Sequence, residues 1–215
     1  MNLDLKNKRA LVCGSTQGIG KAVALELALL GANVTLLARN EEALKKTKTE
    51  LNTEKGQQHS YLVADFSKPD EVRNIVTQFV QRHGAVNILI NNTGGPPSGP
   101  IANAKTEEFL SAFSNHLICN QILAQACLEG MKNSGYGRIV NIISTSVKQP
   151  LPNLGVSNTI RAAVANWSKT WANEVAPFGI TVNNVLPGAT STQRLHTIIE
   201  NNATKNLKPV DEVKE

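Results

Sequence analysis

An apolar strand that runs directly into a glycine-spaced turn is the feature that most limits the fold of this chain. Residues 10–13 are apolar and uncharged, and the turn Gly14-Ser15-Thr16-Gln17-Gly18-Ile19-Gly20 follows them at once. From Lys21 to Leu30, apolar residues then recur at the spacing of a helix. A strand, a glycine turn and a helix in this order predict a βα unit that binds a nucleotide through its phosphates.

The chemistry of a helix N-terminus explains this prediction. Its first backbone N–H groups lack partners inside the helix, and the helix dipole is positive there, so a pyrophosphate is attracted to it. A side chain would block the approach, so Gly14 serves the tight turn, Gly18 the phosphate contact and Gly20 the packing of helix on strand. The alternative is a plain βα turn with incidental glycines, since many turns use them.

Size and composition indicate one ordinary globular domain. The 215 residues are enough for one well-buried core and few for two. Hydrophobic residues make up 41% of the chain and charged residues 18%, with a net charge of +5. The lysines are scattered, and no stripe of basic and aromatic side chains is present, so nucleic acid is not the expected partner. We interpret the positive charge as solvated helix faces with some attraction for phosphates.

The cysteines and the N-terminus favour a cytoplasmic protein. Cys13, Cys119 and Cys127 are odd in number, lack CxxC spacing and lie in apolar surroundings, which predicts buried thiols rather than a disulfide or a metal site. Residues 1–9 are polar and charged, so they do not form a secretory signal. No apolar run approaches the length that spans a membrane, so no membrane association is expected.

Apolar strands alternate with amphipathic helices along the whole chain. This alternation predicts right-handed βαβ crossovers and a doubly wound, Rossmann-type parallel sheet in a single domain, residues 1–215. The expected strands are Arg9–Cys13, Asn33–Ala38, Ser60–Ala64, Val86–Asn91, Arg138–Ser144 and Thr181–Leu186. The expected helices are Gly18–Leu30, Glu41–Lys55, Asp70–His83, Thr106–Asn133 and Gly155–Ala176.

Several motifs follow the expected strands at the edge where such sheets bind ligands. Asp65 comes after the third strand, Asn91-Asn92-Thr93-Gly94 after the fourth, Ser144 ends the fifth, and Pro187-Gly188 follows the sixth. With the glycine turn, these motifs make the whole chain resemble the short-chain dehydrogenase/reductase family in its compact one-domain form. Within that family the overall pattern is similar to that of the 3-oxoacyl-[acyl-carrier-protein] reductases.

The resemblance implies a dinucleotide cofactor, and two positions favour NADP(H) over NAD(H). NAD sites usually place an acidic residue at the end of the second strand, where this chain has Ala38 followed by Arg39. A guanidinium can pair with a 2′-phosphate, which a carboxylate would repel. The family's other phosphate-reading position holds the neutral Gln17, and Arg39 could instead be a solvated residue before a helix.

Further cofactor contacts are implied by the same resemblance. Asp65 matches the contact to the adenine edge, with capping of the helix near Pro69 as the alternative, and Thr190 and Thr192 match contacts to the nicotinamide amide, with plain turn residues as the alternative. The full set of implied cofactor residues is Gly14, Ser15, Gln17, Gly18, Ile19, Gly20, Arg39, Asp65, Asn92, Gly94, Arg161, Pro187, Gly188, Thr190 and Thr192.

The implied catalytic set departs from the family pattern. Family members use a serine, a tyrosine that supplies the proton, a lysine that lowers the pKa of that tyrosine, and an asparagine that anchors a water relay. Ser144 matches the serine, whereas Ser157 stands at the tyrosine, Arg161 at the lysine and His116 at the asparagine, with Asn115 beside it. An aliphatic hydroxyl is a far weaker acid than a phenol, and arginine stays protonated in proteins. The usual proton path therefore does not transfer to this chain.

Three hypotheses remain for the function. The first is a reductase of a small carbonyl compound, or dehydrogenase of a secondary alcohol, in which Ser144 and Ser157 hold the substrate oxygen and Arg161 stabilises it. His116 then gives the proton directly or through water, because imidazole titrates near neutral pH; a packing or surface role is its alternative. The second is an NADP(H)-binding protein that has lost its chemistry and acts as a sensor or assembly partner. The third is another reaction type in the same pocket.

Self-association and a substrate lid are also implied by the resemblance. The helices at 106–133 and 155–176 carry apolar residues on more than one face, and in the family they form a dimer interface, so we expect a homodimer or homotetramer. Residues 189–215 resemble the mobile substrate lid. The helix and last strand with which family members usually close the sheet are not visible in the sequence, which we interpret as a truncated chain or an open sheet edge.

Overall fold

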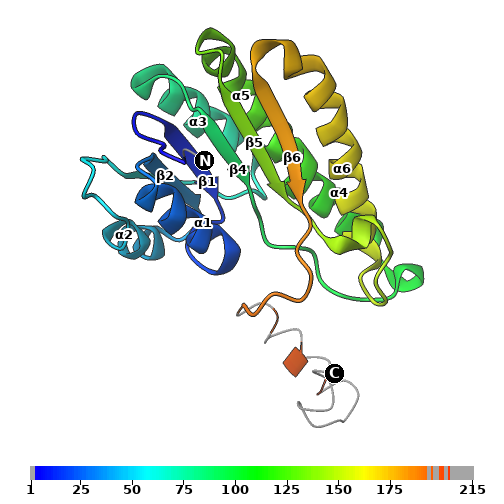
Figure 1. Ribbon diagram of the computed structural model, residues 1–215. Helices are drawn as coiled ribbons and strands as arrows, with labels where there is room; N and C mark the ends of the chain where they lie inside the picture. The colour runs from blue at the N-terminus through cyan, green and yellow to red at the C-terminus, as the bar shows by residue number, and fades with distance from the viewer. Residues whose placement is uncertain (1–2, 193–194, 196–198, 201–202, 204–215) are drawn as a thin grey trace.

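A parallel six-stranded sheet forms the centre of the protein (Figure 1). The computed structural model describes residues 3–192, 195, 199–200 and 203. The strand order is β3-β2-β1-β4-β5-β6, and every neighbouring pair is parallel. The strands are β1 Arg9–Cys13, β2 Asn33–Ala38, β3 Ser60–Val63, β4 Ile88–Asn91, β5 Gly137–Ile142 and β6 Ile180–Val185. The predicted doubly wound Rossmann-type fold is confirmed.

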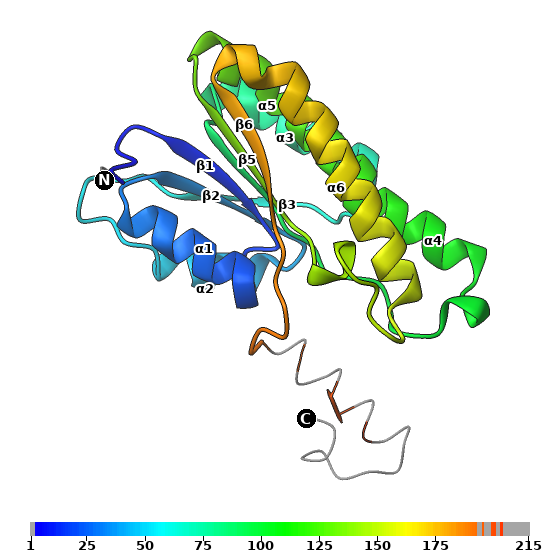
Figure 2. The same cartoon turned by 45° about the vertical axis from the view of Figure 1, so that its right-hand side comes forward.

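Helices cover both faces of this sheet (Figure 2). One face carries α1 and α2, and the other carries α3, α5 and α6, with α4 continuing beyond the sheet beside α6. The helices are α1 Gly18–Leu29, α2 Glu41–Thr49, α3 Pro69–His83, α4 Thr106–Phe113, α5 Cys119–Asn133 and α6 Gly155–Val175.

Alternation along the strands creates a separate core on each face. Ala10 and Val12 of β1 point toward α1 and α2, whereas Leu11 and Cys13 point toward α3 and α5. All four side chains are fully buried. A central parallel strand is covered on both faces, which is why β1 is apolar without interruption.

Two helices and one strand differ from their predicted extents. The second ends at Thr49 instead of Lys55, because Leu51 turns into the core while the following polar residues form a loop. The predicted helix 106–133 is divided by a π-helical turn, Ser114–Ile118, between α4 and α5. β5 ends at Ile142 rather than at Ser144, because Ser144 begins a short 3₁₀ turn, Thr145–Val147. The remaining boundaries agree within two residues.

The three cysteines are buried free thiols, as the sequence predicts. Burial raises the pKa of the Cys127 thiol to about 12, and burial followed by the charge of Asp65 raises that of Cys119 to about 12. Thiols with such values are almost fully protonated near neutral pH and are poor nucleophiles.

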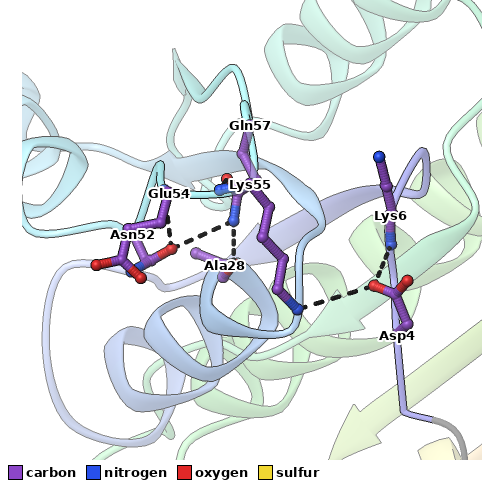
Figure 3. Close-up of polar contacts among 7 residues, drawn as sticks. All are labelled: Asp4, Lys6, Ala28, Asn52, Glu54, Lys55 and Gln57. Carbon is purple, nitrogen blue, oxygen red and sulfur yellow. Dashed lines mark hydrogen bonds and ion pairs between the residues drawn. The ribbon is translucent and has the colours of Figure 1, made fainter.

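A buried glutamine joins the end of α1 to the loop before β3 (Figure 3). Gln57 is 7% exposed, and its side-chain amide donates to the Ala28 carbonyl at 2.7 Å. Its Oε1 accepts the backbone N–H of Lys55 at 2.8 Å. Both ends of the buried amide are thus hydrogen-bonded, which holds the end of α1 to the loop before β3.

We expect Gln57→Met to lower the free energy of unfolding by about 1–3 kcal/mol, since a buried donor and acceptor lose their partner. Urea unfolding followed by circular dichroism measures this. Gln58→Met is the matched control, because Gln58 is exposed and only its backbone N–H, which the substitution keeps, bonds Asn33. Equal stabilities of the two variants would contradict the role given to Gln57.

Candidate functional site

The carboxyl ends of β1 and β4 meet at the point where the chain changes direction across the sheet. β1 pairs with β2 on one side and with β4 on the other. The connections from β1 and β2 lead to α1 and α2 on one face, and the connection from β4 leads to α4 and α5 on the other. In open α/β sheets this switch point is where ligands bind.

The glycine turn occupies this point and leaves no room for side chains. Gly14 and Gly18 have φ of +57° and +53°, which favour glycine. A Cβ on Gly20 would lie 2.2 Å from the Gly14 carbonyl oxygen and 2.6 Å from Nδ2 of Asn92. That Nδ2 donates to the carbonyls of Cys13 and Gly14, each at 3.2 Å. Asn92, the residue directly after β4, therefore fixes the turn.

The start of α1 presents bare main chain to a ligand. Gln17 is the N-cap in an extended conformation, no side chain caps the helix, and its first turn has no acidic residue. The Ser15 side chain is buried and accepts the Leu37 N–H at 3.1 Å, so only the Ser15 backbone remains for a ligand. A cradle closed to side chains beneath an uncapped helix end fits a pyrophosphate.

Two residues for which the resemblance implies contacts to the adenosine part of the cofactor follow neighbouring strands: Arg39 is exposed directly after β2, and Asp65 follows β3. The Ser67 N–H donates to Asp65 at 2.9 Å and lowers the pKa of that carboxyl, with smaller contributions from the charges of Arg39 and Lys68. Asp65 does not cap α3, because the N-cap of that helix is Lys68. The capping alternative for Asp65 is therefore wrong, since its carboxylate is used within its own turn.

Beyond β5, Ser144 lies at the start of the 3₁₀ turn. It is half-buried, and its Oγ accepts the Ser146 N–H at 3.1 Å. The next residue, Thr145, donates its N–H to the Pro187 carbonyl at 3.3 Å. The structure thus brings the ends of β5 and β6 together, with Ser144 and the Pro187-Gly188 pair on adjacent segments.

Helix α6 brings Ser157 and Arg161 to the same region. Ser157 is half-buried in the first turn of α6, and Arg161 follows one turn later. Arg161 Nη1 donates to the Ile142 carbonyl at 2.9 Å, two residues before Ser144. The guanidinium is therefore anchored at the base of the Ser144 turn, where a lysine-for-arginine exchange would change the hydrogen-bonding geometry.

His116 is placed by the π-helical turn rather than by a regular helix. Its side chain is 2% exposed, whereas Phe113 and Ile118 on either side are exposed. This turn packs against α6 and α3. The neighbouring Asn115 Oδ1 is buried without a hydrogen-bond partner among the described residues. Single π turns inside α-helices are frequent at functional sites.

Of the segment after β6, the structure describes a short part next to the glycine turn. A Cβ on Gly18 would lie 3.3 Å from Thr192 Cγ2, so Thr192 lies over the turn. Thr190 Oγ1 donates within its own segment, to the Gly188 carbonyl at 3.4 Å. Gly94 is exposed, with open space around it. Most of the predicted lid 189–215 lies outside the described residues.

Neither tyrosine of the chain lies near Ser144. Tyr61 on β3 donates its hydroxyl to Glu41 at 3.1 Å. Tyr136 precedes β5 at the amino end of the sheet, between the cations of Lys8 at 4.2 Å and Arg138 at 4.1 Å from its ring centre. The sequence holds no further tyrosine, so no phenol is available at this edge.

Sequence reasoning missed a buried polar network beneath the site. Asn91 Nδ2 donates to Asn141 Oδ1 at 2.8 Å, across the register pair of β4 and β5. Asn141 Nδ2 donates onward to Ser168 of α6 at 3.1 Å and to Asn184 of β6 at 3.2 Å. An asparagine inside the apolar run of β5 was the available signal, since a buried amide needs partners.

No helix of the described part of the chain is both long and apolar enough to cross a bilayer.

Comparisons with known proteins agree with this geometry. Residues 8–203 match the family described as short chain dehydrogenase. The 3-oxoacyl-[acyl-carrier-protein] reductase FabG of Vibrio cholerae is 31% identical over 210 residues, 97% of this chain and 84% of that protein. The NADPH-dependent reductase BacG of Bacillus subtilis is 29% identical over 203 residues, 94% of this chain and 78% of that protein. The structure of YwfH, an NADPH-dependent reductase of bacilysin biosynthesis, has a TM-score of 0.87 at 30% identity, covering 92% of this chain and 78% of YwfH.

Proposed function

Because the chain belongs to the short-chain dehydrogenase family, we propose that it is an NADP(H)-dependent oxidoreductase acting on a small carbonyl or secondary alcohol. The observation that carries this proposal is the cradle at Gly14, Gly18 and Gly20, which excludes side chains beneath an uncapped helix end. The NADPH dependence in the names of BacG and YwfH supports the choice of cofactor.

The residues that would hold the cofactor follow the edge of the sheet. Backbone N–H groups of residues 17–20 would bind the pyrophosphate. Arg39, exposed and followed by no acidic residue before the helix, would pair with the 2′-phosphate. Arg161 would bind ribose hydroxyls, and the segment around Pro187 and Thr192 would contact the nicotinamide end. Bound NADPH would supply a hydride to the carbonyl carbon.

The side chains near the end of β5 would bind the carbonyl oxygen of the substrate and supply its proton. The hydroxyls of Ser144 and Ser157 would hold the carbonyl oxygen, and the guanidinium of Arg161 would stabilise negative charge that develops on it. A proton must reach that oxygen as the carbon is reduced. We propose that water supplies it, with His116 as the group that relays it from the π-helical turn.

A second candidate function rests on the missing phenol. Both tyrosines lie elsewhere, at β3 and before β5, while the cradle is intact. A protein that binds NADP(H) as a ligand, for sensing or assembly, would retain the cradle and lose the acid. Tight NADPH binding without oxidation across ketones and aldehydes would favour this second candidate over the reductase.

Self-association is part of the same proposal. Leu110 and Phe113 on α4 and Ile118 in the π-helical turn are exposed, whereas Leu123 and Val164 lie in the core. On α4 itself Ala112 is buried, so this helix packs one apolar face against the described part of the chain and leaves a second apolar face exposed. We propose that a second copy covers the other, so sedimentation should give the mass of two or four chains.

The cofactor assignment predicts a charge-dependent preference. Titrations followed by tryptophan fluorescence or calorimetry should show NADPH binding at least tenfold more tightly than NADH. Arg39→Gln should weaken NADPH binding about 10–100-fold and leave NADH unchanged, because the guanidinium bonds to the 2′-phosphate alone.

Lys46→Gln removes an exposed charge from α2 and serves as the control for general electrostatic attraction. Equal affinities for the two dinucleotides, or equal losses in both variants, would refute the role of Arg39. A ketone panel monitored at the nicotinamide absorbance then separates the reductase from the ligand-binding protein.

A further inference from the structure

Two loops beside Ser157 are joined into one surface, which we call the wall and which carries Ile101 and Leu151. The loop after β4 and the loop before α6 meet in a bridge between Gly99 and Leu154. The Gly99 N–H donates to the Asn153 carbonyl at 2.7 Å, and the Gly155 N–H donates to the Gly99 carbonyl at 3.3 Å. Since Ser157 lies two residues after Gly155, this wall adjoins the place where the substrate oxygen would be held.

The wall is fixed at both of its edges. Asn158 of α6 donates its side-chain amide to the Leu151 carbonyl at 2.9 Å. On the other loop, a Cβ on Gly155 would lie 2.5 Å from Cβ of Ile101, so Ile101 packs directly on the start of α6. The wall is therefore part of the rigid frame of the site.

Three described segments around the proposed substrate position contain no charged residue. No Asp, Glu, Lys, Arg or His occurs in residues 85–104, 149–160 or 175–192, although the chain has a net charge of +5. Apolar side chains are instead exposed on the wall, with Ile101 57% and Leu151 39% exposed. The flanking cations, Lys105 and Lys148, are exposed to solvent at the outer ends of the two loops.

An anionic substrate would find little compensation on such a wall. A carboxylate or phosphate that leaves water needs a charged or hydrogen-bonding partner. Arg161 lies in this region, and its Nη1 is already bonded to the Ile142 carbonyl. An apolar substituent, by contrast, gains free energy by covering the exposed parts of Ile101 and Leu151.

We infer that the substrate is a neutral carbonyl compound whose alkyl or aryl substituent lies against the Ile101–Leu151 wall, and that keto acids and sugar phosphates are rejected. This inference rests on the proposed reductase function. It deepens that function by deriving the chemical class of the substrate from the two loops that form the wall.

Methyl acetoacetate and acetoacetate test it, because they share the reacting carbonyl and differ in charge. With NADPH as cofactor, kcat/KM should be at least about 50-fold higher for the ester. Each methylene added to a 2-alkanone should raise kcat/KM roughly two- to fourfold while the chain reaches along the wall. Equal values for ester and acid, or a preference for the acid, would overturn the inference.

Ile101→Lys should lower the ratio of kcat/KM for the ester to kcat/KM for the acid at least about fivefold, because it places a cation on the wall. Leu29→Lys is the control, since Leu29 is 51% exposed on α1 and away from the wall. Both variants should keep the NADPH affinity of the parent. The same narrowing in the control would contradict the role of the wall.

If NADPH binds and neither compound is reduced, the proposed reductase function fails. The inference is then judged by saturation-transfer NMR on the NADPH-loaded protein. Signals from the ester and none from the acid would support it, and equal signals from both would overturn it.

Discussion

Gly20→Ala is expected to abolish dinucleotide binding and to destabilise the protein. The added Cβ would lie 2.2 Å from the Gly14 carbonyl oxygen and 2.6 Å from the Asn92 amide, so main chain must move to make room. We expect the free energy of unfolding to fall by about 3 kcal/mol. NADPH affinity should fall at least about 100-fold, because the displaced turn no longer presents the N–H groups of α1. Urea unfolding and calorimetric titration measure the two effects.

Ala22→Ser is the matched control for this variant. It also adds one heavy atom to the first turns of α1, but at an exposed position. It should change neither stability nor affinity by more than about twofold in the equilibrium constants. If the Gly20→Ala protein bound NADPH like the parent, the glycine cradle would not be the phosphate site. The proposed function would then lose its main support.

Ser157→Tyr combined with Arg161→Lys is expected to raise the turnover of an apolar ketone about 100-fold at neutral pH. A phenol whose pKa is lowered by a neighbouring ammonium group is a far better proton donor than an aliphatic hydroxyl. General acid catalysis contributes about 10²–10⁴-fold to rates. The two positions lie one turn apart on α6, so their side chains lie on one face of the helix.

Each single variant should gain much less than the pair, because the acid and the cation act together. NADPH affinity and unfolding free energy, measured on all three proteins, identify any loss caused by misfolding. A double variant that folds, binds NADPH and gains nothing would show that the substrate oxygen does not lie at Ser144 and Ser157.

His116→Asn in the parent separates the two sources of the proton. If His116 relays it, turnover should fall about 10–100-fold and the dependence on pH near neutrality should flatten. In the Ser157→Tyr, Arg161→Lys background the same change should matter little, since the phenol supplies the proton. An equal loss in both backgrounds would assign His116 a packing role, in agreement with its burial.

Local pattern was enough to predict the framework of this protein. β1 and β2 were predicted to the residue, and the glycine turn was placed at the start of α1. The reason is physical: periodicities of two and of 3.6 residues, and the steric freedom of glycine, are encoded over a few neighbouring residues. The π-helical turn at Ser114–Ile118 was not predicted, because the apolar spacing of that helix continues through it.

Only part of the candidate site could be predicted before the structure was known. The resemblance to the family implied Ser144, Ser157 and Arg161 as site residues, whereas the direction of the Ser15 side chain, toward the Leu37 N–H, could not be predicted. The network of Asn91, Asn141 and Ser168 was not predicted either, since each of these polar residues looks isolated in the sequence until its partners are known.

The sequence by itself determined that a parallel sheet with a glycine turn before its first helix would form, and that a serine stands where the resemblance expects a tyrosine. Only the tertiary structure decided that Arg161 is anchored on Ile142, that His116 is enclosed in a π-helical turn, and that the loops of Gly99 and Leu154 form one wall. The contacts Arg161–Ile142 and Gly99–Leu154 join residues that are 19 and 55 positions apart in the chain. Their geometry depends on how whole elements pack, and no local propensity encodes it.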